Sequence, residues 1–261
     1  MNQQLLDKSN AEFWATLCGT TMARGAGITG QDPGDLRRFD DVYFDYYPYL
    51  ERYLLTNFDS EKVLEIGLGY GTLGQAIASR NADYHGVDIS TESVALMRTR
   101  LRWLGLPETP VREGSALELP YPDEAFERVY SIGCLHHTGN LTRSVDEVYR
   151  VLRPGGEAVV MVYNRRSLRR LAFAARRWAF TKSPGSGARL ARRYDADESG
   201  NLAPHTDFVS KTEAKRLFAR FDRVRIDVQN FGDYRPWIKR EWLLGNIARV
   251  LGLDLYIVAT K

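Results

Sequence analysis

The sequence predicts an α/β fold in which a mostly parallel β-sheet is covered by helices on both faces. Short runs of β-branched and aliphatic residues alternate with helical patterns from residue 62 onward, which is the spacing of βαβ units. Glycines follow the first of these runs at Gly67, Gly69 and Gly71. The composition, 44% hydrophobic and 26% charged over 261 residues, is that of a globular domain and excludes a disordered, collagen-like or coiled-coil chain.

The individual elements follow from residue periodicity and from turn residues. Apolar residues at mostly three- and four-residue spacing predict a helix over 36–56, which Pro48 should kink or split. Ser90 is a candidate N-cap of the helix that follows it. We expect strands over 62–66, 84–88, 126–132, 157–163, 224–228 and 253–260, and further helices over 72–80, 91–103, 144–152, 211–220 and 237–250.

Targeting and metal signals are absent from the sequence as we interpret it. The longest apolar runs fall far short of the roughly 20 residues that a membrane span needs. Residues 1–10 lack a basic segment followed by an apolar core, so we predict no secretory signal. Cys18 and Cys134 alone cannot form a disulfide framework or a zinc site. We therefore expect a cytoplasmic protein without a bound metal.

The charge is unevenly distributed. Residues 158–194 contain ten basic residues and no acidic one. Because the whole chain has a net charge of +3, the remainder carries −7. A concentrated basic segment is typical of a surface that meets phosphates, nucleic acid or anionic lipid. A solvated helix face explains the same pattern, and the sequence does not separate the two.

The glycine-rich turn carries the strongest chemical signal. A strand that ends in glycines and leads into a helix lets the backbone approach a ligand closely. Gly69, Gly71 and Gly74 also match a dinucleotide fingerprint, with Asp88 at the distance expected for a ribose ligand. Glu65 at the strand end disfavours a pyrophosphate and favours a cationic ligand. An NAD-dependent oxidoreductase is therefore the weaker alternative.

Five ordered motifs resemble those of class I S-adenosylmethionine (SAM)-dependent methyltransferases. They are Glu65-x-Gly67-x-Gly69-x-Gly71, the strand end 86–90, the loop 114–120, the segment 131–137 and the turn 151–156. The resemblance covers residues 60–163 and, more loosely, 253–261. Within this family, the sequence is similar to the small-molecule branch of quinone, lipid and natural-product methyltransferases. The resemblance implies a Rossmann-like sheet of seven mostly parallel strands with an antiparallel last strand.

The resemblance also implies roles for individual residues. Glu65 would help to hold the methionine end of SAM, Asp88 would accept from the ribose hydroxyls, and Ile89 would pack on the adenine. Ser115 stands where the family commonly has an aspartate for the adenine amino group, so this contact could shift to a backbone amide or to Ala116. The full set of cofactor residues expected on this basis is Glu65, Gly67, Leu68, Gly69, Asp88, Ile89, Ser115, Ala116 and Tyr46. Each of them has an alternative, purely structural interpretation.

The acceptor side is less defined. Transfer would be an in-line displacement at the sulfonium methyl, which needs a base only when the acceptor must lose a proton. His136 and His137 follow the fourth strand and are the candidates for that base. Candidate acceptor-binding residues are Tyr43 and Tyr47 in the N-terminal helix and Arg169 and Arg170 in the basic segment.

Residues 1–57 are thus expected to form a helical lid and 58–163 the SAM-binding core. Residues 164–205 would be a basic helical insertion between strands five and six, and 206–261 would complete the sheet. We expect a methyltransferase for a small acceptor, with an anionic one favoured by the basic segment. The alternatives are a membrane-associated lipid or quinone precursor, with peripheral membrane contact through 164–193, and a non-catalytic SAM-fold binding protein. A nucleic-acid substrate is disfavoured, and the oligomeric state is not predicted.

Overall fold

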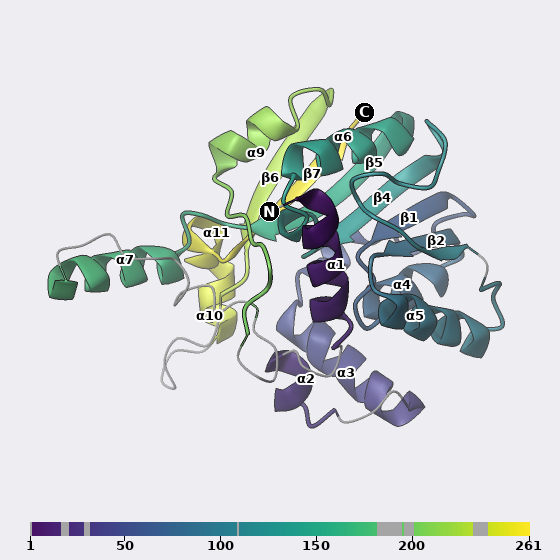
Figure 1. The fold of residues 1–261 in the computed structure, drawn as a ribbon, viewed down its shortest axis with the longest axis horizontal. Coiled ribbons are helices and arrows are strands. Elements are labelled where there is room, and N and C mark those ends of the chain that lie inside the picture. Colours follow the sequence, from purple (N-terminus) through teal and green to yellow (C-terminus); the bar gives the residue numbers. More distant parts are fainter. Residues whose placement is uncertain are drawn as a thin grey trace.

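Seven strands form one sheet in the order β3-β2-β1-β4-β5-β7-β6 (Figure 1). The computed structural model describes residues 2–16, 21–28, 32–108, 110–181, 195, 201–231 and 240–261. The strands are β1 (Lys62–Ile66), β2 (Asp83–Asp88), β3 (Val111–Glu113), β4 (Phe126–Ile132), β5 (Leu152–Tyr163), β6 (Arg223–Gln229) and β7 (Asp254–Thr260). β1 to β5 pair in parallel, and β7 runs antiparallel between β5 and β6. This confirms the predicted fold class.

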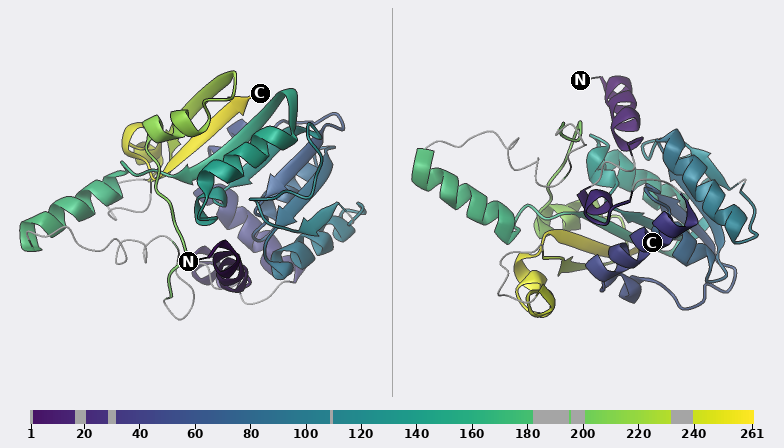
Figure 2. Two further views of the ribbon diagram at one scale, coloured as in Figure 1. Left: turned by 45° about the horizontal axis from the view of Figure 1, so that its top comes forward. Right: turned by 90° about the horizontal axis from the view of Figure 1, so that it is seen from below.

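Helices cover both faces of this sheet (Figure 2). The helices are α1 (Gln3–Trp14), α2 (Thr21–Gly25), α3 (Pro33–Tyr46), α4 (Thr72–Ala78), α5 (Thr91–Trp103), α6 (Leu141–Val151), α7 (Leu168–Thr181), α9 (Lys211–Leu217), α10 (Arg240–Gly245) and α11 (Ala248–Leu251), with 3-10 turns η2 (Leu50–Tyr53) and η3 (Leu135–His137). α6 and α9 pack on one face, and η2, α4 and α5 on the other. Within the described ranges, no helix is both long and apolar enough to cross a membrane.

Burial on both faces explains why the central strands are apolar without alternation. In β1, Val63 packs with α4 and α5, whereas Leu64 faces the opposite layer with α6. Successive side chains of a strand point to opposite faces, so a strand covered on both sides is apolar at most positions. In β1 the exceptions are Lys62 at its start and the buried Glu65 near its end. The run Lys62–Ile66 is therefore recognisable as a buried strand from its residues alone.

The boundaries of several elements differ from the predictions. The helix expected over 36–56 is split as Pro48 requires: α3 ends at Tyr46 and a 3-10 turn begins at Leu50. The turn around Gly155 lies within β5, as an irregularity in its pairing with β4, and does not precede the strand. The sequence does not predict β3, because a strand of three residues is too short to show a periodic pattern.

The expectation of one helix over 237–250 is wrong for its described part. Two short helices, α10 and α11, replace it, and residues 237–239 lie outside the described residues. α10 ends at Gly245, a residue that disfavours a helix interior. By contrast, α5 begins as predicted, since the hydroxyl of Ser90 accepts from the amide of Ser93 at 3.3 Å.

Candidate active site

The glycine loop lies where β1 meets the first helix of the core. Gly67, Gly69 and Gly71 all have positive φ, at 86°, 49° and 72°, a region that side chains other than glycine rarely adopt. A Cβ on Gly67 would lie 2.4 Å from the Cβ of Cys134, so the loop must pass directly against the end of β4. A Cβ on Gly69 would meet nothing within 4 Å. Gly67 therefore serves close packing, and Gly69 borders open space.

Asp88 connects the glycine loop to the end of β2. Its Oδ2 accepts from the amide of Leu68 at 2.6 Å, and its Oδ1 accepts from the amide of Ser90 at 2.8 Å. Burial raises the pKa of Asp88, while these backbone hydrogen bonds act in the opposite direction. The backbone amides of Gly69 and Ile89 also act on this carboxylate, and Asp88 lines the cavity beside the glycine loop.

Glu65 is buried at the end of β1, and the hydroxyl of Tyr84 donates to its Oε2 at 2.5 Å. Burial raises the pKa of Glu65 to about 8, partly opposed by this hydrogen bond. A Cβ on Gly74 would collide with both partners, which is why a glycine is needed in α4 beside them. A buried carboxyl of this kind gains from a cationic ligand.

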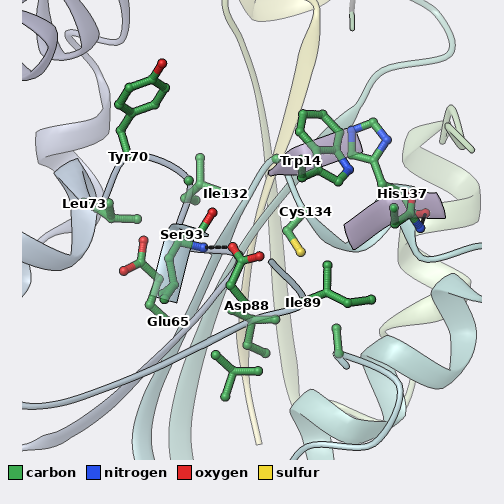
Figure 3. A pocket seen from close by; sticks show the side chains of 18 of the residues that line it. Trp14, Glu65, Tyr70, Leu73, Asp88, Ile89, Ser93, Ile132, Cys134 and His137 are labelled. Carbon is green, nitrogen blue, oxygen red and sulfur yellow. Dashed lines mark hydrogen bonds between the residues drawn. The ribbon is translucent and has the colours of Figure 1, made fainter. Parts of the chain in front are cut away.

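These residues line one cavity of about 280 Å³ at the carboxyl edge of the sheet (Figure 3). The predicted residues that line it are Glu65, Gly67, Leu68, Gly69, Asp88, Ile89, Ser115, Ala116, Tyr43 and His137. In Figure 3, Glu65 and Asp88 lie on one side of this space, and Trp14 and His137 on the other. The structure thus brings together the strand ends, the loop after β3 and part of the N-terminal segment.

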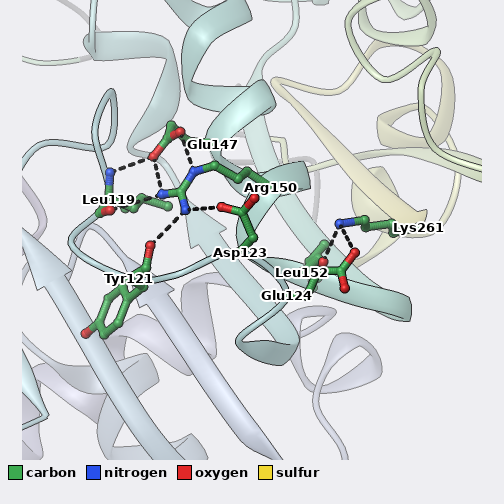
Figure 4. A network of polar contacts seen from close by, with 8 residues as sticks. All are labelled: Leu119, Tyr121, Asp123, Glu124, Glu147, Arg150, Leu152 and Lys261. Carbon is green, nitrogen blue, oxygen red and sulfur yellow. Dashed lines mark hydrogen bonds and ion pairs between the residues drawn. The ribbon is translucent and has the colours of Figure 1, made fainter.

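The segment that carries Ser115 and Ala116 is anchored by Arg150 of α6 (Figure 4). The Arg150 guanidinium donates to the carbonyls of Leu119 and Tyr121, at 3.1 and 2.8 Å. Glu147 accepts from both Arg150 and the amide of Leu119. This network holds the cavity wall formed by residues 115 and 116 in place.

Helix α1 covers the cavity; it lies within the lid expected over residues 1–57, but the sequence pattern predicts the lid helix at 36–56 and no helix at 3–14. Asp7, Asn10 and Trp14 of this helix line the cavity. The helix is fixed by the side chains of Gln3 and Asn10, which donate to the carbonyls of Thr138 and His137, each at 2.9 Å. The only signal available in the sequence was a weakly amphipathic segment at residues 3–14.

Five candidate residues do not line this cavity in the described part of the chain. Tyr46 lies beneath Arg240, whose guanidinium carbon is 4.3 Å from the ring centroid. Tyr47 packs between Tyr43, Tyr46 and Tyr49. Arg170 stacks on Phe208 at 3.8 Å. Arg169 lies close enough to Asp254 to lower the pKa of that carboxyl, which burial raises to about 7 overall.

The fifth is His136, and its surroundings differ sharply from those of its neighbour. His136 is fully buried, and neither ring nitrogen has a hydrogen-bond partner among the residues that the structure describes. Burial lowers the pKa of His136 well below its usual value, so its ring stays neutral. His137 lines the cavity and contacts the Trp14 ring at 4.8 Å between centroids.

The tautomer of His137 follows from its hydrogen bonds. Nδ1 lies 2.7 Å from the carbonyl oxygen of His205, which can only accept, so Nδ1 carries a proton. Nε2 lies 3.7 Å from Oδ2 of Asp195, a carboxylate that also accepts from the hydroxyl of Tyr163 at 2.9 Å. His137 therefore joins the end of β4 to the segment between β5 and β6.

The charge of the cavity wall is acidic. Among the described residues that line it, Asp7, Glu65 and Asp88 are acidic, and none is lysine or arginine. The described residues also contain no group of three or more histidine, cysteine, aspartate or glutamate side chains arranged to hold a metal ion. Burial raises the pKa of the Cys134 thiol to about 12, so this cavity residue stays protonated.

Fold and sequence together define the class. Residues 64–160 match a family model described as "Methyltransferase domain", and this segment contains the last three residues of β1, all of β2 to β4, most of β5 and most of the cavity lining. Residues 64–160 thus match a methyltransferase domain, and the fold and family to which they are similar are those of class I SAM-dependent methyltransferases, whose cofactor is S-adenosylmethionine.

Individual relatives are similar over part of their length. A malonyl-[acyl-carrier protein] O-methyltransferase of Halorhodospira halophila is 31% identical over 162 residues, which cover 61% of this chain and 52% of that protein. A phosphatidylethanolamine N-methyltransferase of Cereibacter sphaeroides is 36% identical over 101 residues, which cover 38% of this chain and 49% of that protein. The chain therefore spans about half the length of these relatives.

Solved structures share the fold at low sequence identity. A SAM-dependent methyltransferase from Thermotoga maritima has a TM-score of 0.56 at 20% identity, covering 84% of this chain and 90% of that one. One from Methanosarcina mazei has a TM-score of 0.55 at 20% identity, covering 82% and 97%. These similarities extend beyond residues 64–160 to the N-terminal and C-terminal parts of the chain.

Proposed function

We propose that this chain transfers a methyl group from SAM to a small-molecule acceptor. The observation that carries the proposal is the cavity itself, where Glu65, the glycine loop, Asp88 and the 115–116 segment meet at one sheet edge. SAM fits this site, since two buried carboxyl groups face a cationic ligand and Gly69 leaves open space for it. When bound, SAM supplies a methyl group already activated by its sulfonium.

The proposed division of the cofactor site follows the positions of its residues. Asp88 accepts from the ribose hydroxyls, because its carboxylate lines the cavity and is held in place by the amides of Leu68 and Ser90. Glu65 stabilises the cationic methionine end. Ile89 and Ala116 offer apolar surface to the adenine, and Ser115 retains a hydroxyl for hydrogen bonding. Tyr46 is not part of this proposal, because it packs against Arg240 instead.

Proton removal from the acceptor, where the acceptor requires it, is assigned to His137 and not to His136. His137 lines the cavity, and its Nε2 is the nitrogen left without a proton when Nδ1 donates to His205. Asp195 lies 3.7 Å from Nε2 and would stabilise the imidazolium. His136 has no access to the cavity.

The charge of the residues that line the cavity is the basis for the proposed class of acceptor. The acidic lining favours a neutral or cationic group at the methyl-accepting end. An anionic part of the acceptor would then lie outside the cavity, toward the basic residues of 164–205. A lipid or quinone precursor remains the second candidate, supported by the acceptor named for the Cereibacter relative. The division into lid (1–57), core (58–163), insertion (164–205) and sheet completion (206–261) is part of the same proposal.

Calorimetry tests the first step of this proposal. The protein should bind SAM and its demethylated product S-adenosylhomocysteine, and should not bind NAD. The second step is tested by release of S-adenosylhomocysteine in the presence of a panel of amines, phenols, carboxylic acids and lipids. Binding of NAD in place of SAM would refute the proposal. SAM binding without turnover on any acceptor would favour the non-catalytic alternative.

A further inference from the structure

Helix α7 extends away from the sheet in all three views of the molecule (Figures 1 and 2). Its first turn is attached to the body: Leu168 packs against the cluster formed by Phe231, Leu243 and Ala248, and Arg170 stacks on Phe208. Just beyond this turn, Leu171 is 46% exposed. Ala174 and Ala175 are exposed as well.

The composition of α7 is unusual for a helix that is surrounded by water. Of its 14 residues, LRRLAFAARRWAFT, nine are apolar, four are arginine and none is acidic. The surrounding sequence has no acidic residue from 158 to 194. An extended helix of this kind needs a cover that is apolar and anionic at the same time. Burial of apolar surface contributes about 25 cal/mol per Å², and a negative surface offsets the repulsion among the arginines.

Three kinds of cover can be compared on these grounds. A second copy of this chain would bring the same four arginines against the first set, which repel. The core of an interface with a folded protein is depleted of charge, whereas α7 intersperses arginines with aromatic and aliphatic residues throughout. In an anionic bilayer, the boundary between lipid headgroups and acyl chains is negatively charged on one side and apolar on the other. Helices that contain Arg, Trp, Phe and Leu bind at this boundary.

We propose that α7 docks on an anionic lipid surface. The helix has 14 residues, a length that lies in the interface and does not span it. Arg176 and Arg177 fall in the second half of α7, and we assign their charges to the lipid headgroups. Each arginine or lysine near such a surface strengthens binding severalfold.

Docking would also orient the active site, a consequence that rests on the proposed function. α7 follows β5, whose end lies beside that of β4, and the cavity is built on the β4 end at Ile132, Gly133 and Cys134. A membrane-bound α7 therefore brings the cavity edge close to the lipid, where an apolar acceptor would be found.

Vesicle co-sedimentation with the full chain tests the proposal. The probes are vesicles of phosphatidylcholine alone and with about one third phosphatidylglycerol, at low and at high salt. We expect binding to the anionic vesicles only, weakened at high salt. The double variant Arg176→Glu/Arg177→Glu should lower the partition coefficient more than tenfold. Leu171→Gln, which keeps the charge, should lower it severalfold because apolar contact is lost.

The matched control is Arg52→Glu/Arg223→Glu. Both residues are exposed and lie together in a groove at the edge of the sheet opposite the cavity. The two substitutions change the net charge by the same amount as Arg176→Glu/Arg177→Glu. This control should bind vesicles within twofold of the wild type. Equal losses in both double variants, no wild-type binding to anionic vesicles, or equally tight binding of wild type to polyglutamate would each overturn the lipid assignment.

Calorimetry with SAM separates this inference from the proposed function. The α7 variants should bind SAM within twofold of the wild type, because none of the altered residues lines the cavity. Loss of vesicle binding with intact SAM binding is the expected result for Arg176→Glu/Arg177→Glu. Absence of SAM binding in the wild type would overturn the methyltransferase proposal. The lipid-docking proposal would then still be accepted or rejected on the vesicle binding data alone.

Discussion

Arg100 of α5 and Asp40 of α3 form a two-pronged ion pair, with N–O distances of 2.7 and 2.8 Å. The Arg100 side chain is 1% exposed, and the hydroxyl of Thr72 donates to the same carboxylate at 2.6 Å. The pair therefore attaches the N-terminal helices to the helix layer of the core, and it sets how α3 is rotated about its axis. Tyr43, which lines the cavity, lies on that helix.

Removal of this pair should be costly. Asp40→Ala leaves the Arg100 charge buried without its partner, and we expect the free energy of unfolding to fall by about 3–5 kcal/mol. Urea unfolding followed by circular dichroism measures this. The neighbouring exposed residue provides the control: Asp41→Ala should change stability by less than about 0.5 kcal/mol. Similar losses in both variants would show that the pair contributes little.

Asp88→Ala should weaken SAM binding by roughly 1–3 kcal/mol, the usual cost of lost hydrogen bonds at a buried site. Part of this loss comes through the glycine loop, because Asp88 also holds the amide of Leu68. Calorimetry with SAM gives the value. Asp83→Ala, at the exposed start of the same strand, is the control and should bind as the wild type does. Unchanged affinity in Asp88→Ala would remove this residue from the site.

Gly69→Val should abolish SAM binding in a folded protein, because the added side chain would occupy the open space beside the loop. Gly105 is a matched control, since its φ of +69° is also positive and a Cβ there likewise meets nothing within 4 Å. Both variants should lose about 1 kcal/mol or more of stability through backbone strain. Only Gly69→Val should lose the cofactor. Equal SAM affinity in the two variants would mean that the loop is only a turn.

Glu65 should make the stability of the cofactor-free protein depend on pH. Burial raises its pKa from the ordinary 4.5 to about 8, so between these values the native state binds a proton that the unfolded chain releases. Stability falls with rising pH wherever the native state binds more protons. The free energy of unfolding should therefore decrease between about pH 5 and pH 8.

Comparison with Glu65→Gln isolates this contribution, because glutamine cannot titrate. Urea unfolding at several pH values should give a flatter dependence for Glu65→Gln than for the wild type across that range. Glu147 provides the contrast: its pKa is lowered, mainly by its hydrogen bond to Arg150, so Glu147→Gln should leave the slope between pH 5 and 8 unchanged. Identical slopes in the wild type and Glu65→Gln would contradict the assignment.

The residues that line the cavity at the ends of strands β1 and β2 could be predicted because their signals are local. β1 is covered on both faces and therefore reads as an apolar run, and Gly67 and Gly69 follow it at positions where the backbone has positive φ. Asp88 ends the next strand, and Ser90 caps the helix after it. None of these features needs information from a distant part of the chain.

A lid over residues 1–57 is expected from the sequence, but the exact placement of α1 within it could not be predicted, for the opposite reason. Its place over the cavity depends on bonds from Gln3 and Asn10 to residues 135 and 127 positions away in the sequence. No local pattern encodes such a pairing. The amphipathic character of residues 3–14 indicates that a helix has a buried side and does not indicate which surface covers it.

The sequence by itself determined the fold class, the strand ends and the glycine loop, since these depend on periodicity and on backbone conformations specific to certain residues. Only the tertiary structure decided which of several neighbouring side chains faces the cavity. Tyr43 lines it and Tyr46 does not, because Arg240, nearly two hundred residues later, stacks on Tyr46. His137 lines it and His136 is buried behind it. The direction of a side chain is set by the packing of elements that are distant in sequence, and composition and spacing carry no record of that packing.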